Sequence, residues 1–295
     1  MPKTERWQWY VERFGPAEFH HHAVEEVYYA GRTPFQDVAV IRTATFGKML
    51  VIDGDTQSSQ ADERIYHESL VHPALAALGE RGRVLILGGG EGATLREVLR
   101  RSDVANCAMV DIDGDVVALS KRYLPEWSAG AFDDPRACVV IGDALTFLKE
   151  SGEPFDAIIS DLTEPLEGSP SNPLFCEDVF LDIKRRLTPE GVYVLQASTA
   201  GLHNMALHAK MARTLRRHYR YVRSSYTHVP AFDNDWAFLT CSDAVDVAAL
   251  PAERIDAYVR GLRGENFFYD AETHRRLFNL PLYLRRELER DGDVF

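Results

Sequence analysis

A run of short apolar segments separated by helical stretches begins at Arg83 and constrains the fold more than any other feature of the chain. The apolar segments are RVLILG, CAMVDID, ACVVIGDA, FDAIISDL and GVYVLQA. Continuous apolar runs of this length are typical of strands that are buried on both faces. The stretches between them, such as TLREVLRRS and DVFLDIKRRL, repeat apolar residues at helical spacing. This alternation predicts a parallel, doubly wound α/β sheet.

The segments on either side of this region predict antiparallel strands. The segment DVAVIRTATFGKMLVIDGDTQSS alternates apolar and polar residues and contains Gly47 and Gly54 as turn residues. We therefore expect the first 80 residues to be mainly strands and turns, with two hairpins. After Arg220, YVRSSYTHVP and WAFLTCSD predict a closing antiparallel pair, and helical segments follow.

Composition excludes several classes of partner. The chain has 33 Lys and Arg against 45 Asp and Glu, and its net charge of −12 opposes binding to nucleic acid or anionic membranes and suits a cationic ligand. It contains no apolar run near the about 20 residues of a membrane helix and no signal segment, so we expect a cytoplasmic protein. The four cysteines form no CxxC pair, and the three histidines at 20–22 are expected to be solvated or packed, so no metal site is predicted.

The turn GGGEG after the first apolar segment indicates the kind of ligand. Gly88, Gly90 and Ala93 satisfy a loose pattern that serves dinucleotides, S-adenosyl ligands or a purely structural turn. Glu91 would lie near the helix N-terminus, where a pyrophosphate would bind, and two anions in one pocket repel each other. Glu91 would also oppose the carboxylate of S-adenosylmethionine. A decarboxylated relative that carries a terminal ammonium is therefore favoured.

Acidic residues follow the next three strands, and ligands of open α/β sheets bind beyond these strand ends. Asp111 can accept both hydroxyls of a ribose, whereas Asp113 fits helix capping better. Asp143 can receive the exocyclic amine of an adenine. Asp161 and Glu164 lie on the loop after a buried strand. Each acid could instead be a helix cap, but their number on consecutive turns favours a common site.

An aminopropyl sulfonium would be attacked by a neutral amine at the carbon next to sulfur, with an uncharged thioether as the leaving group. The site must then remove a proton and hold the amine in line with the carbon–sulfur bond. Asp161 is the candidate base. Tyr66 and His67 could cover the pocket, although such a pair is more often a packed interface element.

These segments resemble the polyamine aminopropyltransferases, the family of spermidine, spermine and thermospermine synthases. The matching segments, in the family's order, are FQD, FGKMLVIDG, DERIYHESLVHP, GGGEGATLREVL, DID, GDA, DLTEP and HVPAF. The resemblance implies a small N-terminal β domain (1–78) ahead of a Rossmann-like, methyltransferase-type doubly wound domain (79–295), assembled as a homodimer or homotetramer. It also implies transfer of an aminopropyl group from decarboxylated S-adenosylmethionine to a polyamine, with release of methylthioadenosine and without a metal or cofactor.

The resemblance also assigns roles to residues at matching positions. Asp161 corresponds to the proton acceptor, and Tyr66 lies on the amine side next to it. The donor is expected to contact Gln36, Gly88, Gly90, Glu91, Asp111, Asp143 and Ala144. The acceptor amine is expected to contact His67, Glu164, Phe232 and Trp236.

Departures from the common spermidine synthase pattern concern the acceptor. DLTEP places Glu164 where many relatives have Asp, the loop LEGSPSNPLF is about two residues longer, and Phe232 replaces a tyrosine. These features resemble the thermospermine synthase subgroup and favour a longer acceptor such as spermidine, with putrescine or agmatine as alternatives. Two other functions compete: an S-adenosylmethionine-dependent methyltransferase of the same fold and a non-catalytic polyamine- or nucleoside-binding protein.

Overall fold

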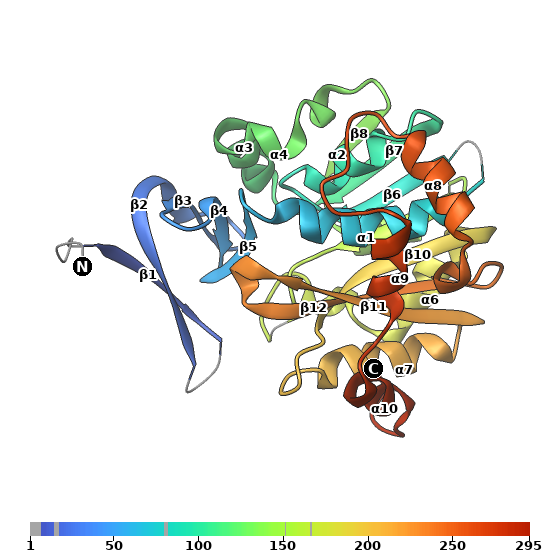
Figure 1. Ribbon diagram of the computed structural model, residues 1–295. Helices are drawn as coiled ribbons and strands as arrows, with labels where there is room; N and C mark the ends of the chain where they lie inside the picture. Colours follow the sequence, from blue (N-terminus) through green and yellow to red (C-terminus); the bar gives the residue numbers. More distant parts are fainter. Residues whose placement is uncertain (1–6, 15–17, 80–81, 151, 166) are drawn as a thin grey trace.

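The N-terminal lobe is one antiparallel sheet. The computed structural model describes residues 7–14, 18–79, 82–150, 152–165 and 167–295. The first five strands pair in chain order as a meander, which contains the two expected hairpins between Asp37 and Ser59. They are β1 (Gln8–Arg13), β2 (Phe19–Arg32), β3 (Asp37–Thr43), β4 (Gly47–Ile52) and β5 (Asp55–Ser59). Figure 1 shows this sheet as a lobe beside the larger α/β lobe.

The second lobe is built on the predicted doubly wound sheet. Its strand order is β11-β12-β10-β9-β6-β7-β8, in which the pairs among β6 to β10 are parallel and those of β12 with β10 and β11 are antiparallel. Both the parallel core and the closing antiparallel pair are therefore confirmed. The strands are β6 (Gly82–Gly88), β7 (Val104–Asp111), β8 (Ala137–Ile141), β9 (Phe155–Asp161), β10 (Leu187–Thr199), β11 (Tyr221–Val229) and β12 (Asn234–Ser242).

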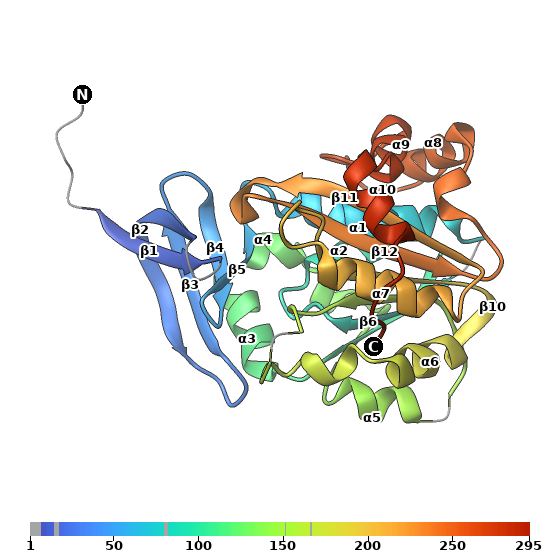
Figure 2. The same ribbon diagram turned by 90° about the horizontal axis from the view of Figure 1, so that it is seen from below.

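Helices cover both faces of this sheet. Successive residues of β6 point to opposite faces, so Leu85 and Leu87 join one hydrophobic core while Val84 and Ile86 join another. Figure 2 shows α5, α6 and α7 on one side of the sheet and α1, α2 and α9 on the other. The helices are α1 (Glu63–Ala77), α2 (Ala93–Leu99), α3 (Gly114–Tyr123), α4 (Pro125–Ser128), α5 (Ala144–Lys149), α6 (Glu177–Arg185), α7 (Ala206–Arg216), α8 (Ala252–Arg260), α9 (Ala271–Phe278) and α10 (Leu282–Glu289).

Helix α1 corrects the expectation that strands and turns continue to residue 80. Almost all of its side chains are buried, and its residues Leu70, Val71 and Leu75 join the core of the second sheet. By packing, α1 thus belongs to the α/β lobe. The structure changes from one lobe to the other between Ser59 and Glu63, earlier than the expected boundary at 78.

A separate apolar core joins the two lobes. It packs β3 and β4 of the first sheet against α2, α3 and α4 of the second lobe, and Trp127 is its largest fully buried side chain. The indole N–H of Trp127 donates a hydrogen bond to Ser58 Oγ (2.9 Å), and the Lys48 ammonium pairs with Glu126 (2.7 Å). These contacts fix the end of β5 against the carboxyl ends of the parallel strands.

Candidate active site

A cavity of about 380 Å³ lies where the two lobes meet, at the carboxyl ends of β6, β7 and β9. The chain order reverses at β6, which pairs with β7 on one side and β9 on the other, and ligands of open α/β sheets bind at such a point. Among the described lining residues, Arg13 and His67 are the basic side chains. The lining carboxylates are Glu12, Asp53, Asp55, Glu91, Asp111, Asp143, Asp161 and Glu164. Their excess makes the cavity suitable for a cation.

The glycine turn brings the backbone of β6 close to its neighbours. Gly88 has a φ of +79°, and a Cβ added there would collide with the backbone carbonyl of Asp161. A Cβ on Gly90 would lie 2.7 Å from Asp111 Oδ2. Position 88 therefore requires glycine, whereas a side chain at position 90 would displace the Asp111 carboxylate. The turn and the two acids are held together before any ligand binds.

Asp161 lies at the centre of the cavity. The hydroxyl of Tyr66 on α1 donates a hydrogen bond to Asp161 Oδ1 (2.9 Å), and Thr94 Oγ1 on α2 donates one to Oδ2 (2.6 Å). Burial, and then the neighbouring Asp161 carboxylate, raises the pKa of Tyr66 well above its ordinary value. Tyr66 therefore stays protonated and orients the Asp161 carboxylate. Two of the sequence-predicted catalytic residues are thus in direct contact.

Glu91 is less isolated than the sequence-based argument assumed. Its Oε2 accepts a hydrogen bond from Ser58 Oγ (2.5 Å), and its Oε1 lies 2.8 Å from His67 Nε2. His67 is only 1% exposed, and its Nδ1 lies 2.7 Å from the Glu63 carbonyl oxygen. Glu91 lines the cavity as expected. His67 also lines it, but both ring nitrogens bind protein groups.

Asp111 and Asp113 separate into two roles. Asp113 caps α3 as predicted, since its Oδ1 accepts hydrogen bonds from the backbone N–H groups of Asp115 (3.1 Å) and Val116 (3.2 Å). Asp111 lines the cavity, and burial raises its pKa to about 6. Gln36 also lines the cavity, but its amide nitrogen donates to Asp113 Oδ2 (3.0 Å).

Asp143 and Ala144 lie at the start of α5. Asp143 caps this helix, because its carboxylate accepts hydrogen bonds from the Leu145 N–H (3.0 Å) and the Thr146 hydroxyl (3.0 Å). Both Asp143 and Ala144 also line the cavity. The capping role and the expected contact with an adenine therefore fall on the same carboxylate.

The remaining wall combines aromatic rings with a second group of acids. The rings of Phe232 and Trp236 meet edge to face, with centroids 5.0 Å apart. Burial raises the pKa of Glu164, whose carboxylate accepts a hydrogen bond from Ser198. Burial, followed by the charges of Glu12 and Glu164, raises the pKa of Asp55 to about 6. Of the long loop at 166–173, Leu166 lies outside the described residues.

Sequence reasoning missed several residues of the site, among them Glu12, Asp53, Asp55, Ser58 and Thr94. Asp55 and Ser58 lie in DGDTQSS, which was interpreted only as a hairpin, and a polar strand beside a glycine turn is the signal that could have found them. Thr94 follows the glycine turn directly. Glu12 gives no such signal, since β1 reaches the cavity only through the fold of the sheet.

Across the described ranges, no three or more His, Cys, Asp or Glu side chains are grouped so that they could hold a metal ion. In the same part of the chain, no helix is both long and apolar enough to cross a membrane.

Comparison with known proteins gives matches over nearly the whole chain. Residues 63–249 match the family described as "Spermine/spermidine synthase domain", and residues 8–60 match "Spermidine synthase tetramerisation domain". The polyamine aminopropyltransferase of Sulfolobus acidocaldarius is 43% identical, with 98% of this chain and 95% of the relative covered. That of Aeropyrum pernix is 41% identical, with 97% and 92% covered.

Solved structures give the same result. A spermidine synthase in complex with the transition-state analogue AdoDATO superposes with a TM-score of 0.90 at 27% identity, covering 97% of this chain and 96% of that one. The spermidine synthase from Thermotoga maritima has a TM-score of 0.88 at 27% identity, with 97% and 95% covered. These matches do not favour the methyltransferase alternative. The chain belongs to the spermidine/spermine synthase family and is a polyamine aminopropyltransferase.

Proposed function

We propose that the enzyme transfers the aminopropyl group of decarboxylated S-adenosylmethionine to a polyamine longer than putrescine, with spermidine as the preferred acceptor. The observation that carries this proposal is the second group of acids, Glu12, Asp55 and Glu164, in the same cavity as Asp161. Spermidine has two ammonium groups besides the nitrogen that reacts, whereas putrescine has one. An acceptor with more positive charges gains more from this group of acids.

The proposed donor site lies around the glycine turn. Asp111 would accept the ribose hydroxyls, and Asp143 with Ala144 would contact the adenine. Glu91 would bind the ammonium of the aminopropyl arm, and it has the required carboxylate at the cavity wall. The acids give no favourable partner for the extra carboxylate of S-adenosylmethionine, which supports a donor that lacks this group.

The proposed reaction is a direct displacement with Asp161 as the base. The lone pair of the acceptor nitrogen attacks the aminopropyl carbon bonded to sulfur, and the carbon–sulfur electron pair passes to sulfur. The sulfonium thereby becomes the neutral thioether of methylthioadenosine. The proton of the attacking nitrogen passes to Asp161, whose carboxylate Tyr66 and Thr94 hold in place. The proposal requires no metal or resident cofactor.

We also propose that the enzyme is a homo-oligomer and acts in the cytoplasm. The match of residues 8–60 to a tetramerisation domain supports assembly through the N-terminal sheet. Trp7, Trp9, Val11 and Phe19 are exposed on this sheet or just before it, and an apolar surface of this kind is typical of an interface.

The acceptor is tested by measuring kcat/KM with decarboxylated S-adenosylmethionine and four amines: putrescine, agmatine, spermidine and norspermidine. Chromatography that separates isomeric products shows which nitrogen is alkylated, and release of methylthioadenosine confirms the displacement. We expect spermidine to have the highest kcat/KM. A higher value for putrescine or agmatine would overturn the acceptor assignment but leave aminopropyl transfer intact. S-adenosylmethionine serves as the control donor, from which we expect no transfer.

A further inference from the structure

A chain of buried charged side chains runs from the cavity wall into the protein behind it. Glu91 contacts His67 (2.8 Å), His67 contacts the Glu63 carboxylate (3.0 Å), and Glu63 pairs with Arg96 (2.8 Å). Arg96 then pairs with Glu97 (2.8 Å). The side chains of Glu91, His67, Glu63 and Glu97 are at most 10% exposed. We call these five residues the ionic chain.

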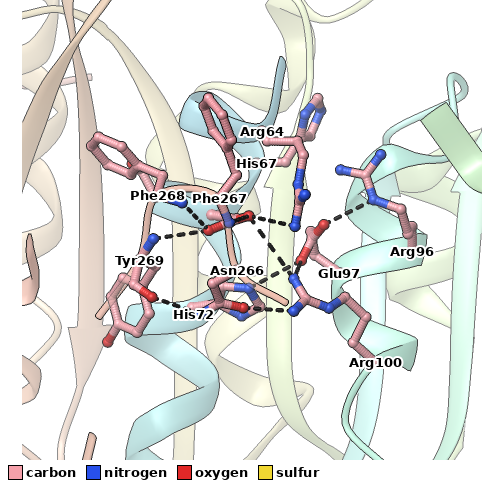
Figure 3. Close-up of polar contacts among 12 residues, drawn as sticks. Arg64, His67, His72, Arg96, Glu97, Arg100, Asn266, Phe267, Phe268 and Tyr269 are labelled. Atoms are coloured by element: carbon pink, nitrogen blue, oxygen red, sulfur yellow. Dashed lines mark hydrogen bonds and ion pairs between the residues drawn. The ribbon is translucent and has the colours of Figure 1, made fainter. Parts of the chain in front are cut away.

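The ionic chain is anchored at its inner end. Glu97 is fully buried, and its carboxylate also contacts Arg100 (2.6 Å) and His72 (3.0 Å). Figure 3 shows that Arg96 of α2 and Arg100, which directly follows that helix, both reach Glu97. The Arg96 guanidinium additionally donates to the Trp127 carbonyl oxygen (2.6 Å). Because each inner member has several partners, the orientation of Glu63 and Arg96 is fixed independently of any ligand.

The hydrogen-bond geometry determines where His67 carries its protons. Nδ1 lies 2.7 Å from the Glu63 carbonyl oxygen, which can only accept, so Nδ1 carries a hydrogen. Nε2 lies 2.8 Å from Glu91 Oε1 and must also carry a hydrogen if Glu91 is ionised. The Glu63 carboxylate, 3.0 Å from Nδ1, favours the positive ring over a neutral ring with a protonated Glu91. His67 is therefore an imidazolium between two carboxylates.

The charges around His67 agree with this assignment. Glu63 and Tyr66 face it from its own helix, Glu91 from the glycine turn, and Arg96 stands behind Glu63 on α2. Burial lowers the pKa of His67, but the hydrogen bonds that its ring donates to Glu63 and Glu91 outweigh burial and raise the pKa well above its ordinary value. As the pH rises, the folded protein thus keeps the imidazolium beyond the range in which a free histidine loses its proton.

We propose that His67 is a positioning residue that points the Glu91 carboxylate at the donor's ammonium, and that Glu63, which Arg96 orients, keeps His67 positively charged for this purpose. The proposal rests on the donor-binding role of Glu91 proposed above. It changes the expected role of His67 from contact with the acceptor to support of the donor site. It also gives a function to Glu63, which does not line the cavity.

The Glu63→Gln variant tests the proposal while leaving His67 and Glu91 unchanged. It removes one of the two carboxylates that hold the proton of His67 and leaves the positive Arg96 close by. His67 should then lose its proton at a lower pH. Its Nε2 lone pair would face the Glu91 carboxylate, and the ion pair would become a repulsion. We therefore expect binding of decarboxylated S-adenosylmethionine to weaken as the pH rises.

The measurement is calorimetric titration with decarboxylated S-adenosylmethionine and, separately, with methylthioadenosine. The titrations cover about pH 6 to pH 9, a range that begins near the ordinary pKa of histidine. Methylthioadenosine shares the adenosine and thioether but lacks the aminopropyl ammonium, so the ratio of the two Kd values isolates the Glu91 subsite. In the native enzyme we expect the ratio of the two Kd values to vary little with pH. In Glu63→Gln we expect decarboxylated S-adenosylmethionine to bind about tenfold more weakly at the upper end, the scale of a lost charged hydrogen bond, with methylthioadenosine unchanged.

Three further variants separate the positioning role of His67 from loss of stability and from the role of Glu91 itself. His67→Gln removes the charge directly and should weaken the same ligand at every pH; it also serves if Glu63→Gln does not fold. Glu68→Gln is the matched control: Glu68 is fully buried on α1 but does not contact His67, so the Kd ratio should stay native even if stability falls. Glu91→Gln tests the subsite itself.

The outcomes distinguish the positioning role of His67 from the donor-binding role of Glu91, on which it depends. If Glu91→Gln leaves the Kd ratio unchanged, the donor-binding role of Glu91 is wrong. If Glu91→Gln raises the ratio but Glu63→Gln and His67→Gln do not, the positioning role of His67 is overturned. Equal weakening of both ligands in Glu63→Gln would indicate general damage to the site and would also overturn it.

Discussion

Asp161 is the residue on which we expect turnover to depend most directly. Both of its carboxylate oxygens accept hydrogen bonds, from Tyr66 and Thr94, so its orientation is fixed before substrates bind. Asp161→Asn keeps the shape but cannot take the proton of the attacking amine. We expect kcat to fall by about 10²-fold or more, the usual scale of general-base loss. Calorimetric titration should show donor binding close to native.

The control for this prediction is Tyr66→Phe, which removes one hydrogen bond to Asp161 and keeps the carboxylate. We expect a smaller loss of kcat than in Asp161→Asn, because the base is less well oriented but still present. Native turnover in Asp161→Asn would remove Asp161 from the mechanism. An equal loss in both variants would mean that orientation, rather than proton transfer, limits the rate.

Asp111 should give donor binding a dependence on pH. Burial raises its pKa to about 6, so it is mostly protonated below that pH in the folded enzyme. This raised pKa stabilises the fold at low pH, and the contribution is lost as the pH rises through about 6. Ribose binding should have the opposite dependence, because in the proposed contact the ionised carboxylate would accept both hydroxyls. We expect the affinity for methylthioadenosine to rise from about pH 5 to about pH 7.

Calorimetric titration with methylthioadenosine at several pH values checks this dependence. Asp111→Asn should bind more weakly at neutral pH and lose most of the pH dependence. A dependence that persists in Asp111→Asn would assign it to another group, such as Asp55, whose pKa burial also raises to about 6.

At this scale, the residues that could be predicted from the sequence were those next to a strand end. Asp111, Asp143 and Asp161 follow buried strands, and the sheet brings them to one edge. The partners of each acid could not be predicted. His67 follows Tyr66 in sequence, but their helical positions send one side chain to Asp161 and the other to Glu91. Such a difference depends on how the helix is rotated in its packing.

Helix α1 carries two sets of polar side chains with different tasks. Tyr66 and His67 face the cavity, whereas Glu68 holds the segment before α9. The fully buried carboxylate of Glu68 accepts hydrogen bonds from the consecutive N–H groups of Phe267, Phe268 and Tyr269, each at 2.8 Å. The C-terminal part of the chain is thereby attached to the helix that carries Tyr66 and His67.

Glu68→Ala should therefore lower the free energy of unfolding by about 3 kcal/mol, because it leaves buried N–H groups and the Arg64 guanidinium without their partner. Urea denaturation measures the change. The matched control is Arg185→Ala, which breaks the Asp182–Arg185 pair on α6, where the arginine is 69% exposed. We expect less than about 1 kcal/mol for that control. A similar small change in Glu68→Ala would show that the segment is held by its apolar packing alone.

The elements that sequence analysis found are those with a clear pattern. Strands β6, β7, β9 and β10 each contain a continuous apolar run, because helices cover both faces of the sheet. Helix α1 was missed for the opposite reason: nearly all its residues are buried, so it has no polar face to produce a helical period. Strand β1 is short and its side chains are mostly exposed, so the sequence gave no signal for this first strand of the meander.

At the scale of the whole molecule, the two lobes share the cavity, and each contributes acids that the other lacks. Glu12, Asp53 and Asp55 come from the N-terminal sheet, whereas Glu91, Asp111, Asp143, Asp161 and Glu164 come from the α/β lobe. The sequence indicated two domains and placed Gln36 of the first in the donor site, but it did not indicate the acids that the first domain contributes. Binding of the acceptor should consequently depend on the N-terminal lobe more than binding of the donor does.

Thermal unfolding with two ligands tests this division. Methylthioadenosine at about 100 times its Kd should stabilise the protein by about 2.7 kcal/mol and raise Tm by about 5 °C. Nicotinamide dinucleotides, as the control, should leave Tm unchanged. Spermidine added to the methylthioadenosine complex should raise Tm further. In Asp55→Asn the shift from methylthioadenosine should remain and the additional shift from spermidine should shrink, because the substitution removes a negative charge from the acceptor side only. An unchanged spermidine shift in Asp55→Asn would place the acceptor away from the N-terminal sheet.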